Sequence, residues 1–157
     1  MSQMLVKVFE AKVSEANAET GEINVYIPMS TSSIDRDGES ISPLAFKKSL
    51  PAFKKRPVLI ASHDYRDLTN QIGDFSNIRI EEDGLYGKPR YYIGKGNEEA
   101  DWGFFLASIG MAAYSVGFIP RLWEDYPEGD GIKTPKRTYS EVELLEKIGR
   151  ASCRERV

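Results

Sequence analysis

The chain has 157 residues, a length that suits a single domain with one hydrophobic core. Hydrophobic residues make up 41% and charged residues 29% of the chain, a balance that excludes global disorder. The net charge is −3, no apolar run is long enough for a bilayer-spanning helix, and the first residues lack the pattern of a signal peptide. We therefore expect a cytoplasmic protein with no membrane contact and no nucleic-acid partner.

Alternating apolar and polar residues, bounded by turn signals, predict that most of the chain is β-strand. The expected strands cover residues 5–11, 22–29, 58–61, 71–81, 85–93, 112–123 and 138–146. Turn signals at 17–21 and 82–84 predict hairpins, and the polar segment 30–42 predicts a loop. The tetrapeptide Ala-Phe-Lys-Lys occurs twice, beginning at Ala45 and at Ala52, which we interpret as chance rather than as a repeat architecture.

Two segments predict short helices. Ser42 is a favoured N-cap and Pro43 a favoured first residue for a helix over residues 44–50. Asn97 predicts the start of a second helix, because acidic residues follow it and apolar residues then recur at helical spacing up to Ile109. Six or seven strands and two short helices predict an α+β fold, β-rich and barrel-like, with an antiparallel sheet.

The last residues of the chain differ from everything before them. Residues 148–157 (IGRASCRERV) match the translation of a common sequencing-adapter oligonucleotide. We therefore expect residues 1–146 to be one domain that is truncated at its C-terminus, and residues 147–157 to be a non-native tail from adapter read-through. The alternative is an ordinary basic tail. The only cysteine, Cys153, lies in this tail, so no internal disulfide is expected.

The chain contains one histidine, His63, which directly follows the apolar run 58–61. Catalytic residues often lie at such places, because a rigid strand positions them while a loop leaves them accessible. A lone histidine is more often a surface or hydrogen-bonded residue, so the position by itself assigns no role. One histidine and no cysteine outside the tail predict no metal site, and nothing in the sequence calls for an organic cofactor.

Ser115 lies among small residues that would let a substrate backbone approach its hydroxyl. Gly117 permits a tight backbone or a nearby amide donor for an oxyanion. The stretch from Tyr114 to Gly117 lacks the first glycine of a Gly-x-Ser-x-Gly elbow. The alternative interpretation is a strand serine that is packed without function.

A serine hydroxyl needs a base within hydrogen-bond reach, and the base works best when a third group orients it. Strand periodicity in residues 138–146 places Glu146 on the same face as Val142 and Leu144, where an unpartnered carboxylate would be costly. Glu146 is therefore the first candidate for the third group.

Three other carboxylates are rivals for that role. Glu141 and Glu143 fall on the opposite face of the same strand and are interpreted as solvated strand charges. Asp64 follows His63 directly, although a neighbour in sequence usually points away from the histidine.

An ordered series of short motifs resembles the prohead (capsid maturation) proteases of tailed phages. The motifs lie at residues 34–38 with 41–50, 57–64 (PVLIASHD), 71–73 with 82–87, 115–118 (SVGF) and 141–146 (EVELLE). The resemblance extends from about residue 23 to residue 146, and the order of the motifs carries it more than any single motif does. The family continues past the position of Glu146, which agrees with the expected truncation.

This resemblance implies that Ser115 is the nucleophile, His63 its general base and Glu146 the orienting acid, with Val116 and Gly117 near the oxyanion. It also implies a fold shared with the herpesvirus assembly proteases, which use a second histidine as the third member. This chain has only one histidine, so an acid or a water would take that place.

The implied activity is that of a serine endopeptidase that acts inside the assembling prohead, in the host cytoplasm. Its substrates would be the scaffolding segment of the phage major capsid protein and the protease itself. Self-association of the chain is expected as well, and no cofactor is required.

Two other functions remain open at this stage. One is a non-catalytic capsid-assembly or scaffold-associated module that keeps the barrel. The other is a small β-barrel that binds nucleic acid or peptide, because Tyr86, Tyr91 and Tyr92 alternate with Lys88 and Arg90. The plainer interpretation of that segment is an exposed, tyrosine-rich strand.

Overall fold

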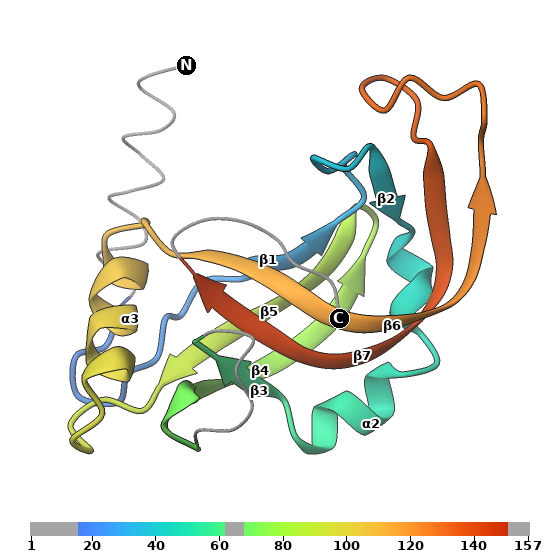
Figure 1. Ribbon diagram of the computed structural model, residues 1–157. Coiled ribbons are helices and arrows are strands. Elements are labelled where there is room, and N and C mark those ends of the chain that lie inside the picture. The colour runs from blue at the N-terminus through green and yellow to red at the C-terminus, as the bar shows by residue number, and fades with distance from the viewer. Residues whose placement is uncertain (1–15, 62–67, 151–157) are drawn as a thin grey trace.

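The computed structural model of the chain describes residues 16–61 and 68–150, with the side chains at positions 113, 115, 116 and 145–150 left out (Figure 1). Within these residues the fold is α+β and strand-rich, with two α-helices. In chain order the elements are β1 (Ile27–Thr31), β2 (Glu39–Ile41), the 3-10 helix η1 (Pro43–Phe46), α2 (Leu50–Lys55), β3 (Val58–Ile60), the 3-10 helix η2 (Leu68–Asn70), β4 (Gln71–Glu81), β5 (Gly84–Tyr91), α3 (Glu98–Ser108), β6 (Ala113–Asp125) and β7 (Arg137–Arg150).

The strands of the described segments pair into one sheet with the order β1-β5-β4-β3-β7-β2, and β6 pairs with the other edge of β7. The four strands β1, β5, β4 and β3 are antiparallel and form a half-barrel. β7 is long enough to hold β2 at its beginning and β3 at its end, both in parallel orientation. Figure 1 shows the β6–β7 hairpin curving across this sheet and continuing beyond it as an arm.

Local signals predict the middle of the chain well. β4 begins and ends where its alternation predicts, and a tight turn joins it to β5. The Asn97 side chain accepts a hydrogen bond from the Glu99 amide at 3.1 Å, which confirms the predicted N-cap of α3. Gly110, just past the end of the helix, has φ of +76°, a conformation that glycine adopts without steric cost.

The predicted helix over residues 44–50 is instead split into η1 and α2. Ser42 is extended and its side chain makes no capping bond, and the Lys47 amide bonds to the Leu44 carbonyl with 3-10 spacing. α2 then begins at Leu50, where the prediction ends. Core packing explains the split, because the aromatic side chain of each short helix is buried.

The N-terminal part differs most from the sequence prediction, because its strands depend on pairing with distant segments. β2 forms within the predicted polar loop because it pairs in parallel with residues 137–139 of β7, and Ser40 Oγ lies 2.9 Å from Thr138 Oγ1. The expected strand 22–29 pairs with β5, and its regular part begins at Ile27. Residues 5–11 lie outside the described residues.

The hydrophobic core lies between the half-barrel, the two α-helices and the β6–β7 hairpin. Its largest fully buried side chains are Tyr91, Phe46, Phe118, Ile23, Met29, Leu59, Leu85, Val142 and Pro89. α3 packs against β4 and β5, and α2 packs against β7. None of the helices in the described segments has the length and hydropathy needed to cross a membrane.

Candidate active site

Ser115 lies near the start of β6, and the backbone register of β6 on β7 defines its neighbours. Ser115 is opposite Ile148, and Gly117 is opposite Glu146. The side chains of Ser115, Val116 and Glu146 are outside the described part of the structure, so these statements concern backbone positions. In an antiparallel pair, diagonal neighbours two positions apart lie about 7 Å from each other. Positions 115 and 146 stand in that relation.

Ile60, the last residue of β3, lies level with Ser115 across the sheet. Ile60 pairs with Ile148, which in turn pairs with Ser115. Ile148 belongs to the segment 147–157 that the sequence predicts to be a non-native tail, and in this structure β7 continues into that segment as far as Arg150. Two strand spacings therefore separate Ile60 from Ser115, a distance of about 10 Å. His63 follows Ile60 by three residues but lies outside the described residues, as does Asp64. β3, the strand that leads to His63, is thus separated from β6, the strand of Ser115, only by β7.

A β-bulge on β7 changes the expected position of Glu146. Phe118 is opposite Leu144 while Gly117 is opposite Glu146, so one extra residue of β7 lies between two successive positions of β6. Phe118 and Leu144 are buried in the core, so the alternation of β6 assigns Glu146 to the other face, together with Ser115. The prediction that Glu146 shares a face with Leu144 assumes an uninterrupted strand, and the bulge removes that assumption.

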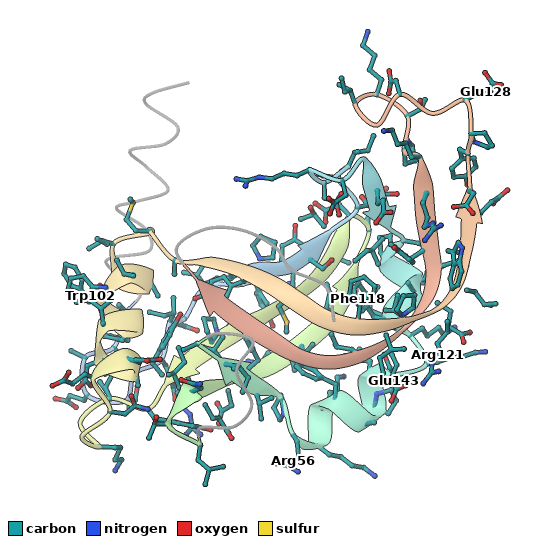
Figure 2. The ribbon with its side chains drawn as sticks, viewed as in Figure 1. Arg56, Trp102, Phe118, Arg121, Glu128 and Glu143 are labelled. Carbon is teal, nitrogen blue, oxygen red and sulfur yellow. The ribbon has the colours of Figure 1, made fainter. Side chains whose placement is uncertain are left out.

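The two rival carboxylates on β7 form ion pairs on the surface. Glu141 Oε1 lies 2.8 Å from Lys48 Nζ, and the hydrogen bond to Glu141 raises the pKa of Lys48. Glu143 pairs with Arg121, as Figure 2 shows where both are labelled. Glu143 is opposite Ile119, four positions from the serine, or about 13 Å along the strand. Their interpretation as surface charges agrees with these contacts.

The core packs directly behind the serine strand through Tyr114. Its hydroxyl lies 2.7 Å from that of Tyr91, and its ring meets Phe75 edge to face with centroids 5.8 Å apart. Burial raises the pKa of Tyr91 to about 12 and raises the pKa of Tyr114 well above its usual value. Both hydroxyls therefore stay protonated at neutral pH, and they support the strand rather than act as bases.

The tyrosine-rich strand β5 alternates between buried side chains and side chains that reach the surface. Tyr91 is buried, and Tyr92 donates a hydrogen bond to Asp74 at 2.9 Å. Arg90 forms two hydrogen bonds with the same carboxylate, at 2.7 and 3.2 Å. Asp74 thus neutralises the charge of Arg90 and also holds the hydroxyl of Tyr92. Tyr86, Lys88, Arg90 and Tyr92 are half-buried or exposed, so both sequence interpretations of this segment stay predictions.

The sequence analysis missed one anchor of this region, Ser49. Its hydroxyl accepts a hydrogen bond from the Leu144 amide at 3.1 Å, beside the bulge of β7. The Ser49 oxygen therefore takes the place of a ladder partner where the register shifts. No local pattern announces this contact, because 95 residues separate the two partners.

Comparisons with known proteins assign no family to the chain. No protein-family model, no curated protein and no solved structure matches the chain. Within residues 16–61 and 68–150, no three histidine, cysteine or acidic side chains gather as they would around a metal ion.

Proposed function

We propose that this protein is a serine endopeptidase that matures phage proheads, with Ser115 as nucleophile, His63 as general base and Glu146 as orienting acid. One observation carries the proposal: β3, β7 and β6 are adjacent, and their register aligns the end of β3 with Ser115. The strand that leads to His63 in sequence and the strands that contain Ser115 and Glu146 are thus neighbours in the sheet.

The face of the sheet also favours this assignment. Tyr114 packs into the core, so alternation assigns position 115 to the opposite face of β6. The bulge brings position 146 to that same face. A nucleophile and its acid on the same face could share a base from the loop after β3.

The proposed chemistry is acyl transfer. His63 takes the proton of the Ser115 hydroxyl as the oxygen attacks a peptide carbonyl, and returns it to the leaving amine. Glu146 orients the imidazole and stabilises its charged form. Backbone amides near Val116 and Gly117 hold the oxyanion, and water then releases the acyl-enzyme.

A closed barrel of six or seven strands, like that of the herpesvirus assembly proteases, belongs to the same proposal. β1 and β6 stand at the two ends of the path β1-β5-β4-β3-β7-β6. Some of their Cα atoms nevertheless approach within 8 Å of each other. Such an approach favours closure of the half-barrel by the hairpin.

The proposed substrates are the scaffolding segment of the phage major capsid protein and the protease itself. Both would be cleaved inside the prohead in the host cytoplasm, where many self-associated copies of the chain are confined with the capsid protein. The motif resemblance supports these partners, and the chemistry requires neither a metal nor a cofactor.

A fluorophosphonate probe tests the nucleophile directly. We expect one adduct on the chain, located at Ser115 by peptide mass spectrometry and absent from Ser115→Ala and His63→Ala. Ser76→Ala is the matched control, because Ser76 is an exposed strand serine on β4 and should leave labelling unchanged. Labelling that persists in Ser115→Ala would reject the nucleophile.

The third group is tested by comparing two glutamates of β7. Glu146→Gln should slow labelling by roughly tenfold or more, since an unoriented imidazole is a poorer base. Glu143→Gln should change the rate little, because Glu143 is committed to Arg121. Equal rates in the two variants would remove Glu146 from the mechanism.

Co-expression with the matching capsid protein tests the biological role. Wild-type chain should process the capsid protein, whereas Ser115→Ala and His63→Ala should not. Processing that continues with both variants would contradict the protease function. Binding of the capsid protein without any processing by the wild-type chain would favour the non-catalytic assembly module.

A further inference from the structure

The two Ala-Phe-Lys-Lys copies have the same structural role, which the sequence analysis did not assign to them. Phe46 and Phe53 are buried in the core, with exposed fractions of 0% and 4%. The lysine pair that follows each of them is exposed, one after η1 and the other at the end of α2. Each copy thus anchors a short helix by its aromatic ring and presents two ammonium groups outside.

These lysines and the adjacent Arg56 make the exposed surface of the segment that contains η1 and α2 basic, and we call this surface the basic patch. The patch consists of Lys47, Lys48, Lys54, Lys55 and Arg56, all of them exposed. Figure 2 labels Arg56 at the edge of the molecule, below α2. The sequence contains no acidic residue between Glu39 and Asp64, so the patch is not neutralised from within its own segment.

Contacts with other elements leave most of this charge uncompensated. Lys48 pairs with Glu141 of β7. Across the described segments, no carboxylate forms an ion pair with the other four cations. The dipole of α2 favours cations in its last turn, which accounts for Lys54 and Lys55 but not for Lys47. Such a concentration of positive charge in a chain of net charge −3 requires a separate explanation.

The patch is held firmly and lies close to the candidate site. Ser49, between the two copies, receives the Leu144 amide, and Leu50 is buried against the core. Leu144 is two residues, or about 7 Å along β7, from Glu146. Leu44 is 66% exposed beside the first lysine pair, so the surface combines cations with an apolar side chain.

We propose that the basic patch binds an acidic polypeptide: an extended segment of a partner protein rich in Asp and Glu, with interspersed apolar residues. Charge complementarity selects an anionic partner. Polypeptide is favoured over nucleic acid because Leu44 offers an apolar contact and no aromatic side chain of η1 or α2 is exposed for base stacking. The proposal goes beyond the protease activity, since binding at this surface requires no cleavage.

Fluorescence anisotropy at low salt tests the proposal. The probe is a labelled synthetic peptide built from Glu-Glu-Leu-Glu repeats, and all proteins carry Ser115→Ala so that cleavage cannot affect the signal. Lys47→Glu/Lys54→Glu should weaken binding by about tenfold or more, since two attractive contacts become repulsive. Lys95→Glu/Lys133→Glu is the matched control, because it changes the net charge equally at exposed positions outside the patch.

The outcomes separate the proposal from its rivals. The proposal is supported if the control variant binds the peptide as the parent does, while the patch variant and the milder Lys47→Gln/Lys54→Gln bind it more weakly. Absence of peptide binding by the Ser115→Ala chain, or equal losses in patch and control variants, would overturn it. Tighter binding of single-stranded DNA of the same charge would overturn the choice of polypeptide. None of these results depends on whether the chain is a protease.

Discussion

The two halves of the β6–β7 hairpin contain the same pair of strands but are stabilised in different ways. In the half next to the half-barrel, Phe118 and Leu144 are buried, and Tyr114 packs against the core. In the far half, Leu122 and Trp123 are 57% and 47% exposed. Only the near half carries the candidate catalytic positions. Both halves have the same strand pairing, but only the near half packs on the core. We infer that core packing, more than strand pairing, holds the candidate site rigidly in place.

Beyond the pairing of β2 with residues 137–139 and the buried ring of Tyr139, the far half is held by surface charges and turn hydrogen bonds. Arg137 bonds to Asp125 at 2.6 Å, and its guanidinium lies 5.2 Å from the centre of the Trp123 ring. At the tip, Asp130 accepts hydrogen bonds from three successive backbone amides, which lower its pKa to about 2. Exposed ion pairs contribute at most about 1 kcal/mol each, so the arm should open more readily than the near half.

The largest expected effect comes from removing the buried ring of the near half. Phe118→Ala should lower the free energy of unfolding by about 3–5 kcal/mol, because Phe118 is 1% exposed and meets Tyr139 edge to face. Leu122→Ala, four residues along the same strand, should cost less than about 0.5 kcal/mol. Urea unfolding of both variants measures the difference. Similar losses in the two would refute the contrast between the halves.

An intermediate effect is expected at the tyrosine pair behind the candidate nucleophile. Tyr91→Phe should destabilise the fold by about 1–2 kcal/mol, because it removes a buried hydroxyl from the Tyr114 hydroxyl at 2.7 Å. The double variant Tyr91→Phe/Tyr114→Phe should be less destabilised than the sum of the single variants. Strict additivity in the double-mutant cycle would contradict the coupling.

The same pair predicts a loss of stability at high pH. Burial raises the pKa of folded Tyr91 to about 12 from an ordinary value of 10.0, so its stabilising contribution is complete below pH 10. As the pH rises from 10 to about 12 the unfolded state ionises first and the contribution is lost. Urea unfolding at pH 9 and pH 11 should show a smaller decrease for Tyr91→Phe than for the wild type, and an equal decrease would contradict this origin.

The smallest effect on global stability is expected in the arm. Arg137→Ala should change the free energy of unfolding by less than about 1 kcal/mol, since its ion pair and cation–π contacts are exposed. Hydrogen exchange should nevertheless speed up at the amides of residues 122–125, while those of 116–118 keep their protection. Faster exchange in both segments would show that the two halves open together.

Local patterns were sufficient where the structure depends on neighbours in sequence. β4 and the N-cap of α3 follow from alternation and from the preference of Asn97 for a cap. The same patterns missed β2 and the bulge before Glu146, because both depend on pairing with strands far away in the chain. For the candidate site, residue types pointed to Ser115 and His63, whereas the relation of Ser115 to β3 required the register.

By itself, the sequence determined the strand-rich class, most turns and the available chemistry, because these depend on periodicity and on residue type. Only the tertiary structure decided that β7 lies between β3 and β6, that a bulge precedes Glu146, and that each Ala-Phe-Lys-Lys copy buries its ring and exposes its lysines. The physical reason is that strand pairing and core burial join residues such as Leu59 and Lys147, whose interaction no local pattern records.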